Sequence, residues 1–177
     1  MIEILWHGRG GQGAFTAARL LGAAWALQND NNYALAFPSF GPERRGAPIR
    51  AFTKLNDRPI GNRSEVEQAD YSIFLDDTLF SDSAFFELKP DGKILLNTKR
   101  KINDARVITL DGDRIAAEIL KRPITNTIML GAFAGIFGKI SLNKIEQSIR
   151  QNMPEKLHQK NIAAVAAAVE NISKEVI

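Results

Sequence analysis

Near its start the chain reads Ile2-Glu3-Ile4-Leu5-Trp6-His7-Gly8-Arg9-Gly10-Gly11-Gln12-Gly13, and this stretch decides the fold. Four glycines within six residues interrupt a short apolar run, and an apolar, helix-like segment follows from Ala14. The pattern predicts a strand, a tight turn and a helix. The glycines at 8, 10 and 13 also fit the spacing G-x-G-x-x-G, in which the backbone approaches a pyrophosphate at a helix N-terminus. The turn therefore has two interpretations, a nucleotide site or a structural joint.

Length and composition are those of an ordinary globular protein. The 177 residues are 45% hydrophobic and 24% charged, which predicts one domain spanning 1–177 with a substantial core. The 23 Lys and Arg exceed the 20 Asp and Glu by a net charge of only +3, and they are scattered along the chain. This balance argues against nucleic acid as a partner.

The chain contains no cysteine, which excludes disulfides, thiolate nucleophiles and iron–sulfur ligation by cysteine. Any redox centre of that kind is expected on another chain. No secretory signal is visible at the N-terminus. The longest apolar run, 128–137, has about half of the roughly 20 residues that a membrane span needs. We therefore expect no membrane span and a cytoplasmic location.

Strand and helix patterns alternate through the first two thirds of the chain, and the last third is helical. The pattern predicts a three-layer α/β/α fold with a mostly parallel sheet, a glycine-rich first βα turn and a helical C-terminal third. Expected strands after the first are 33–37, 49–55, 70–75, 93–97 and 105–110. Expected helices are 14–27, 78–88, a helix capped by Asp111 that ends at Lys121, 126–138, a helix capped by Ser141 that ends at Asn152, and 154–174.

Local signals add detail to this pattern. The β-α-β start favours a parallel crossover to the second strand. Turns are expected at 56–59, where a short hairpin arm can form, and at 90–92. Asn152 with Glu155 resembles a capping box.

The segment 38–48 reads Pro-Ser-Phe-Gly-Pro-Glu-Arg-Arg-Gly-Ala-Pro, and its three prolines and two glycines give it a stiff backbone without regular helix. It carries Arg44 and Arg45, whose planar guanidinium groups suit carboxylates and phosphates. Binding or subunit contact is one interpretation of these arginines. An internal salt bridge, for instance with Glu43, is the other, and the sequence favours neither.

Other candidates for chemistry carry weaker signals. A dinucleotide site needs an acid at the end of the second strand, but Phe37-Pro38 stands there. His7 can be a general base, although the sequence places no acid beside it, and a structural role is favoured. Asp76 and Asp77 follow a strand at the edge where open sheets hold their sites, but a helix cap is the favoured role.

Longer motifs resemble a known family. Gly8-Arg9-Gly10-Gly11-Gln12-Gly13, the segment 36–48, and Pro123-Ile124-Thr125-Asn126-Thr127 leading into 129–133 are similar to the gamma subunit of 2-oxoacid:ferredoxin (or flavodoxin) oxidoreductases. The likeness covers essentially the whole chain. The form of residues 44–48 resembles the pyruvate enzymes more than the 2-oxoglutarate enzymes.

The resemblance implies a subunit of an enzyme that oxidatively decarboxylates pyruvate to acetyl-coenzyme A and CO2. Thiamine diphosphate and iron–sulfur clusters are expected on other subunits, namely thiamine-binding alpha and beta chains and a cluster-bearing delta chain, with ferredoxin or flavodoxin as acceptor. No catalytic residue and no metal ligand is expected on this chain.

Coenzyme A or a neighbouring subunit is the expected contact of the two motifs. The candidate residues are Arg9, Gly10, Gly11, Gln12, Gly13, Arg44 and Arg45. Backbone N–H groups of the turn and the arginine side chains are suited to phosphates. Two alternatives stay open: a stand-alone dinucleotide-dependent oxidoreductase, and a subunit that only scaffolds its neighbours.

Overall fold

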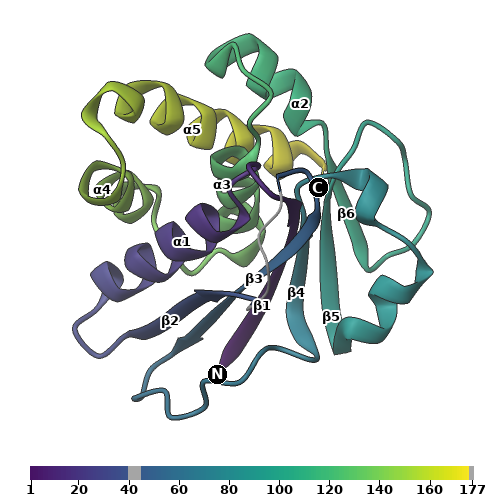
Figure 1. The fold of residues 1–177 in the computed structure, drawn as a ribbon. Coiled ribbons are helices and arrows are strands. Elements are labelled where there is room, and N and C mark those ends of the chain that lie inside the picture. The colour runs from purple at the N-terminus through teal and green to yellow at the C-terminus, as the bar shows by residue number, and fades with distance from the viewer. Residues whose placement is uncertain (40–44, 176–177) are drawn as a thin grey trace.

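The computed structural model describes residues 1–39 and 45–175, in which six strands form one sheet (Figure 1). The strands lie in the order β2-β3-β1-β4-β5-β6. Their bounds are β1 Ile2–Arg9, β2 Tyr33–Pro38, β3 Pro48–Asn56, β4 Ala69–Phe74, β5 Leu88–Asn97 and β6 Val107–Leu110.

Strand directions confirm the predicted α/β class with a mostly parallel sheet. β1 pairs in parallel with β4, and parallel pairing continues through β5 to β6. On its other side β1 pairs antiparallel with β3, which pairs antiparallel with β2. β1 and β2 therefore run in the same direction, as the β-α-β start predicts, but β3 lies between them.

Helices make up most of the chain after β6, as predicted. The α-helices are α1 Ala14–Gln28, α2 Gly112–Ile115, α3 Asn126–Phe137, α4 Leu142–Asn152 and α5 His158–Glu175. Shorter turns are the 3₁₀ segments η1 Asp77–Leu79, η2 Asp82–Glu87 and η4 Glu155–Leu157, and the wider π segment η3 Ala116–Leu120. Figure 1 shows the long helices gathered on one side of the sheet.

Alternate residues of β1 anchor this helical layer. Ile4 and Trp6 are fully buried in the same apolar core as α1 and α3, and the Trp6 ring meets Phe133 of α3 edge-on with centroids 6.5 Å apart. Nearly every residue of α3 is buried, because the helix packs against the sheet and also against α5. A helix that is apolar on most faces belongs in such an interior position.

Glycines let α3 and α5 cross closely. A Cβ on Gly131 would lie 2.6 Å from the Val165 carbonyl oxygen, and one on Gly135 would lie 2.7 Å from Cγ2 of Ile172. Both distances are too short for a methyl group, so glycine is required for this packing. The buried face of α5 includes Asn161, Ala164, Val165, Ala168 and Ile172.

The second face of the sheet is covered by the short η1 and η2 turns over β4 and β5, and by Val66, from the segment between β3 and β4, over β1 and β3. A small core there joins Phe74 and Leu96 of the sheet to Ala84 of η2. The helix predicted at 78–88 is wrong in type, because this stretch forms two separate 3₁₀ segments. The second face therefore carries a thinner layer than the first.

The turn predicted at 90–92 and the hairpin arm predicted at 56–59 are wrong, although β3 ends at Asn56 and the chain bends there as expected. β5 runs through 90–92 with a register shift opposite Ala69 and Tyr71, and a Cβ on Gly92 would lie 2.8 Å from the Ala69 carbonyl oxygen. Glycine and proline thus mark a bulge rather than a turn. Residues 57–68 form no strand, so no hairpin arm follows 56–59, and β3 instead pairs with β1 and β2.

Helix caps were predicted with mixed success. Asp111 accepts a hydrogen bond from the Arg114 amide at 3.0 Å and caps α2 as expected. Ser141 stands at the N-cap of α4, but its hydroxyl donates to Oε1 of Gln28 instead. The Asn152–Glu155 capping box is wrong, because Asn152 ends α4 and donates to the Ser148 carbonyl. Over the described part of the chain, no helix combines the length and the apolar character needed to cross a membrane.

Candidate functional site

The glycine-rich turn joins β1, which ends at Arg9, to α1, which begins at Ala14. Gly11 and Gly13 adopt φ angles of 98° and 82°, a left-handed conformation that favours glycine. A Cβ on Gly13 would also lie 2.4 Å from Nδ2 of Asn126, which begins α3. The turn therefore brings the starts of α1 and α3 together.

Gln12 closes the glycine-rich turn by hydrogen bonding to both backbone groups of Arg9. Its backbone amide donates to the Arg9 carbonyl at 2.9 Å, and its side-chain Oε1 accepts from the Arg9 amide at 2.7 Å. Its Nε2 donates to Oδ2 of Asp76 at 3.1 Å. Gln12 thus satisfies the turn's own polar groups and ties them to the end of β4.

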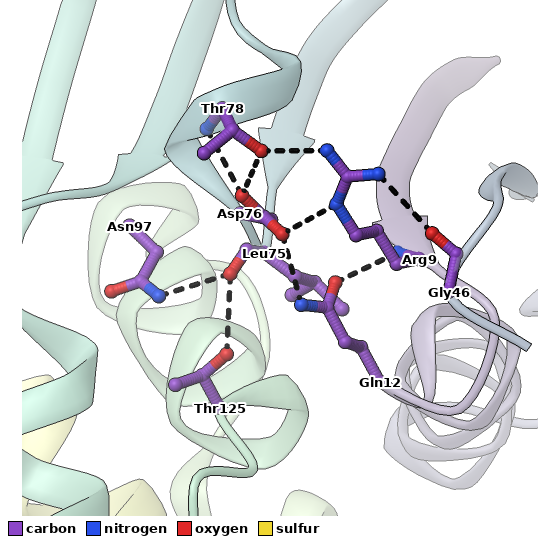
Figure 2. A network of polar contacts seen from close by, with 8 residues as sticks. All are labelled: Arg9, Gln12, Gly46, Leu75, Asp76, Thr78, Asn97 and Thr125. Atoms are coloured by element: carbon purple, nitrogen blue, oxygen red, sulfur yellow. Dashed lines mark hydrogen bonds and ion pairs between the residues drawn. The ribbon is translucent and has the colours of Figure 1, made fainter.

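The Arg9 guanidinium connects the turn to two further segments (Figure 2). Nε donates to Oδ2 of Asp76 at 3.0 Å and Nη2 to the Thr78 hydroxyl at 2.8 Å, just beyond β4. Nη1 donates to the Gly46 carbonyl oxygen at 3.1 Å. The Arg9 side chain is 35% exposed, and three of its five N–H donors serve internal acceptors.

Asp76 has two roles in this arrangement. Its Oδ1 accepts from the Thr78 amide at 3.0 Å, which is the cap of η1 that the sequence predicted. Its Oδ2 receives Arg9 and Gln12. Partial burial opposes ionisation of the carboxyl, but the hydrogen bonds from Thr78, Gln12 and Arg9 outweigh it and hold the pKa of Asp76 below its ordinary value.

The end of the proline-rich segment lies against the glycine-rich turn. The Gly10 amide donates to the Ala47 carbonyl at 2.9 Å, and the Gly46 amide donates to the Gly10 carbonyl at 3.0 Å. Gly10 and Arg45 form an isolated bridge, and Arg45 is exposed. The structure thus unites the two motifs that the sequence singled out. Arg44 and its proposed partner Glu43 lie outside the described residues.

Two polar residues to which the sequence assigned no role in a site, Asn97 and Thr125, complete this edge of the sheet. The Leu75 carbonyl, at the end of β4, accepts from Nδ2 of Asn97 at 3.0 Å and from the Thr125 hydroxyl at 3.5 Å (Figure 2). Asn97 Oδ1 in turn accepts from the Gly112 amide at 2.9 Å. Their common signal is position, since Asn97 ends a strand and Thr125 precedes a helix.

The arrangement disfavours a dinucleotide at this turn. The Gly10 amide, which a pyrophosphate would need, already donates to Ala47. On the side of β1 away from β4 lies β3, whose first residue Pro48 pairs with Arg9, so β2, with its ribose-binding position, is displaced by one strand. Packing and left-handed backbone account for Gly13 without a ligand.

His7 has an acidic neighbour that the sequence did not reveal. Its Nε2 lies 2.9 Å from Oε2 of Glu87, without the alignment of a directional hydrogen bond. The imidazole stacks on Phe74 with centroids 4.1 Å apart and is only 12% exposed. The His7 contact is the main cause of the lowered pKa of Glu87. These contacts support the structural role that the sequence favoured.

The described residues contain no group of three or more His, Asp or Glu side chains placed to hold a metal ion. With no cysteine in the sequence, thiolate ligation of an iron–sulfur cluster is also excluded. The network around Arg9 instead consists of arginine, amide and hydroxyl groups arranged around the carboxylate of Asp76.

Comparison with known proteins identifies the family. The family model described as pyruvate ferredoxin/flavodoxin oxidoreductase matches residues 3–171. The chain belongs to this family. It is 47% identical to pyruvate synthase subunit PorC of Methanothermobacter marburgensis, over 97% of this chain and 98% of that protein.

Further relatives agree. The common gamma subunit of pyruvate/ketoisovalerate oxidoreductases from Thermococcus litoralis is 39% identical over 96% of both chains. The crystal structure of pyruvate oxidoreductase subunit PORC from Thermotoga maritima superposes with a TM-score of 0.81 at 35% identity, covering 96% of this chain and 95% of that one. The oxidoreductase family suggested by the sequence motifs is therefore confirmed.

Proposed function

We propose that the chain is the gamma subunit of a multisubunit pyruvate:ferredoxin or flavodoxin oxidoreductase. The observation that carries the proposal is full-length similarity at 47% identity to a pyruvate synthase subunit. The overall reaction converts pyruvate and coenzyme A to acetyl-coenzyme A and CO2 and passes two electrons to the acceptor. Ketoisovalerate is a second substrate to test, since the name of a 39% identical relative includes both pyruvate and ketoisovalerate oxidoreductases.

Thiamine diphosphate and the iron–sulfur clusters belong to partner subunits in this proposal. Thiamine-binding alpha and beta chains and a cluster-bearing delta chain are the partners we expect. Support comes from the lack of cysteine and from the missing carboxylate cluster among the described residues. We further propose that residues 1–177 act as one domain and that the complex works in the cytoplasm.

The role proposed for this chain is to complete the coenzyme A side of the assembled site. Arg45 is the candidate contact for a coenzyme A phosphate, because its side chain is exposed beside the glycine-rich turn. Gly11 and Gly13, and Arg44 outside the described residues, remain candidates as predicted. Arg9, Gly10 and Gln12 already make internal hydrogen bonds, which makes a supporting role the better assignment for them.

The test is the activity of the complex isolated anaerobically through a tag on this chain. We expect reduction of ferredoxin or a viologen dye that requires both pyruvate and coenzyme A. Activity with 2-oxoglutarate in place of pyruvate would move the chain to another branch of the family. Oxidation of a substrate by the isolated chain with bound NAD or FAD would contradict the proposal.

A further inference from the structure

Arg9 is placed to hold other residues rather than to bind a ligand. Its guanidinium reaches Asp76 and Thr78 on one side and the Gly46 carbonyl on the other, over distances of 2.8–3.1 Å. Its head group thus bridges the turn after β4 and the segment that leads into β3. The planar fork carries five N–H donors spread over three nitrogens, so it reaches acceptors on opposite sides of the head group, over a wider span than the compact ammonium of lysine covers.

The Gly46 carbonyl is a significant point of attachment. In the described part of the chain, Gly46 and Ala47 make two backbone hydrogen bonds to the glycine-rich turn, both with Gly10, at 2.9 and 3.0 Å. Gly46 itself has φ 82° and open space around its Cα, so side-chain packing does not hold it. Arg9 supplies the side-chain contact that fixes this segment.

We infer that Arg9 is a positioning residue, which holds residues 45–47 against the glycine-rich turn and so fixes the place from which Arg45 meets a phosphate of coenzyme A. The inference rests on the proposed function for the identity of that phosphate. The attachment of residues 45–47 to Arg9 stands on the hydrogen bonds alone.

Hydrogen–deuterium exchange in the assembled complex tests the attachment. In Arg9→Gln, peptides containing Gly10 and Gly46 should exchange about tenfold faster, because their two backbone hydrogen bonds lose the support of the guanidinium. Arg58→Gln is the matched control, since the Arg58 side chain is 85% exposed and only 3.9 Å from one acid, Asp57. Rates in Arg9→Gln equal to those of the control would overturn the inference.

If the Arg9→Gln chain does not assemble with the other subunits, the Arg9→Lys variant allows the same exchange experiment. The lysine ammonium keeps a positive charge near Asp76 but cannot also reach the Gly46 carbonyl. We expect faster exchange at Gly46 and unchanged exchange at Thr78. Unchanged exchange at both places would again overturn the inference.

A double-mutant cycle on the KM for coenzyme A tests how Arg9 acts. Arg9→Gln and Arg45→Gln should each raise this KM about tenfold with kcat nearly unchanged, and the double variant should resemble Arg45→Gln, because Arg9 works through Arg45. Two results would show that Arg9 contacts coenzyme A itself and would overturn the positioning role. In the first, the increases in KM of the two single variants multiply in the double variant. In the second, Arg9→Gln raises the KM and Arg45→Gln does not.

Two other outcomes separate this inference from the proposed function. If neither variant changes the KM for coenzyme A, the coenzyme A contact fails, and the exchange experiment alone decides whether Arg9 holds the segment. If Arg45→Gln prevents the other subunits from co-purifying, Arg45 is a subunit contact, which overturns the phosphate assignment.

Discussion

The two ends of β1 carry ion networks of opposite character. At the amino end, Glu3 pairs with Lys54 at 3.3 Å and with Lys89 at 3.0 Å, and Lys89 also pairs with Asp70 at 2.7 Å. The Lys54 side chain is fully buried, and these four residues lie on four different strands. This network holds the sheet together.

At the carboxyl end, Arg9 and Asp76 are 35% and 17% exposed, so neither member of this pair is fully buried as Lys54 is, and the pair joins the end of β1 to the loop after β4. Charges near solvent contribute little to stability, whereas breaking a buried pair is costly. The difference indicates that the amino-end network stabilises the folded sheet, whereas the carboxyl-end network positions loops at the surface. The sheet's ligand-binding edge is the expected place for such a surface.

Removing the buried lysine should have the largest effect on stability. Lys54→Ala should lower the free energy of unfolding by about 3 kcal/mol, because it leaves Oε1 of Glu3 without its partner and opens a cavity. Urea denaturation of the chain measures this. Lys54→Met is the control and should lose less, since it fills the space and Glu3 keeps Lys89. A loss below about 1 kcal/mol for Lys54→Ala would contradict the claim that the amino-end network of β1 stabilises the fold more than the carboxyl-end network does.

A methyl group at Gly13 should have the next largest effect. Gly13→Ala combines a φ of 82° with a Cβ 2.4 Å from Nδ2 of Asn126, so we expect a loss of about 2 kcal/mol. Gly11→Ala, with φ 98° and open space, isolates the backbone cost at about 1 kcal/mol. Thermal denaturation of both variants compares them. Equal losses would show that the Asn126 contact contributes nothing.

Arg9→Gln should change global stability only slightly, by about 1 kcal/mol or less, since its partners are partly exposed. The same urea denaturation used for Lys54→Ala measures it. A loss as large as that of Lys54→Ala would mean that the carboxyl-end network stabilises the fold and does not merely position surface loops.

Acid should weaken the carboxyl-end network by the smallest amount. Because the pKa of Asp76 is lowered in the folded state, its contribution is present above the ordinary pKa and is lost as the pH falls through the folded value. The difference in Tm between the natural protein and Asp76→Asn should therefore shrink as the pH drops below about 4. A difference that is constant with pH would exclude ionisation of Asp76 as its source.

The sequence predicted elements with a strong period and missed features that depend on distant partners. The helices expected at 14–27 and 154–174 were found as α1 and α5, because each is a long segment of apolar residues with helical character. The position of β3 between β1 and β2 was missed, since local patterns do not encode strand order. Pro90 and Gly92 were mistaken for a turn, because the same residue types mark a bulge.

The candidate site was found in part. The glycine-rich turn and Arg45 were singled out from their local composition, and the structure brings them together. The internal use of the Arg9 side chain was not predictable, because its acceptors Asp76 and Gly46 lie 67 and 37 residues away. The partner of His7, Glu87, was missed for the same reason.

The most direct test of the central claim is what accompanies this chain from its native source. Anaerobic purification through a tag on the chain, followed by mass spectrometry and cofactor analysis, should recover thiamine-binding chains and a cluster-bearing chain in fixed proportion. It should also recover thiamine diphosphate and iron with them. Recovery of the chain alone with its own bound nucleotide cofactor would contradict its assignment as an oxidoreductase subunit.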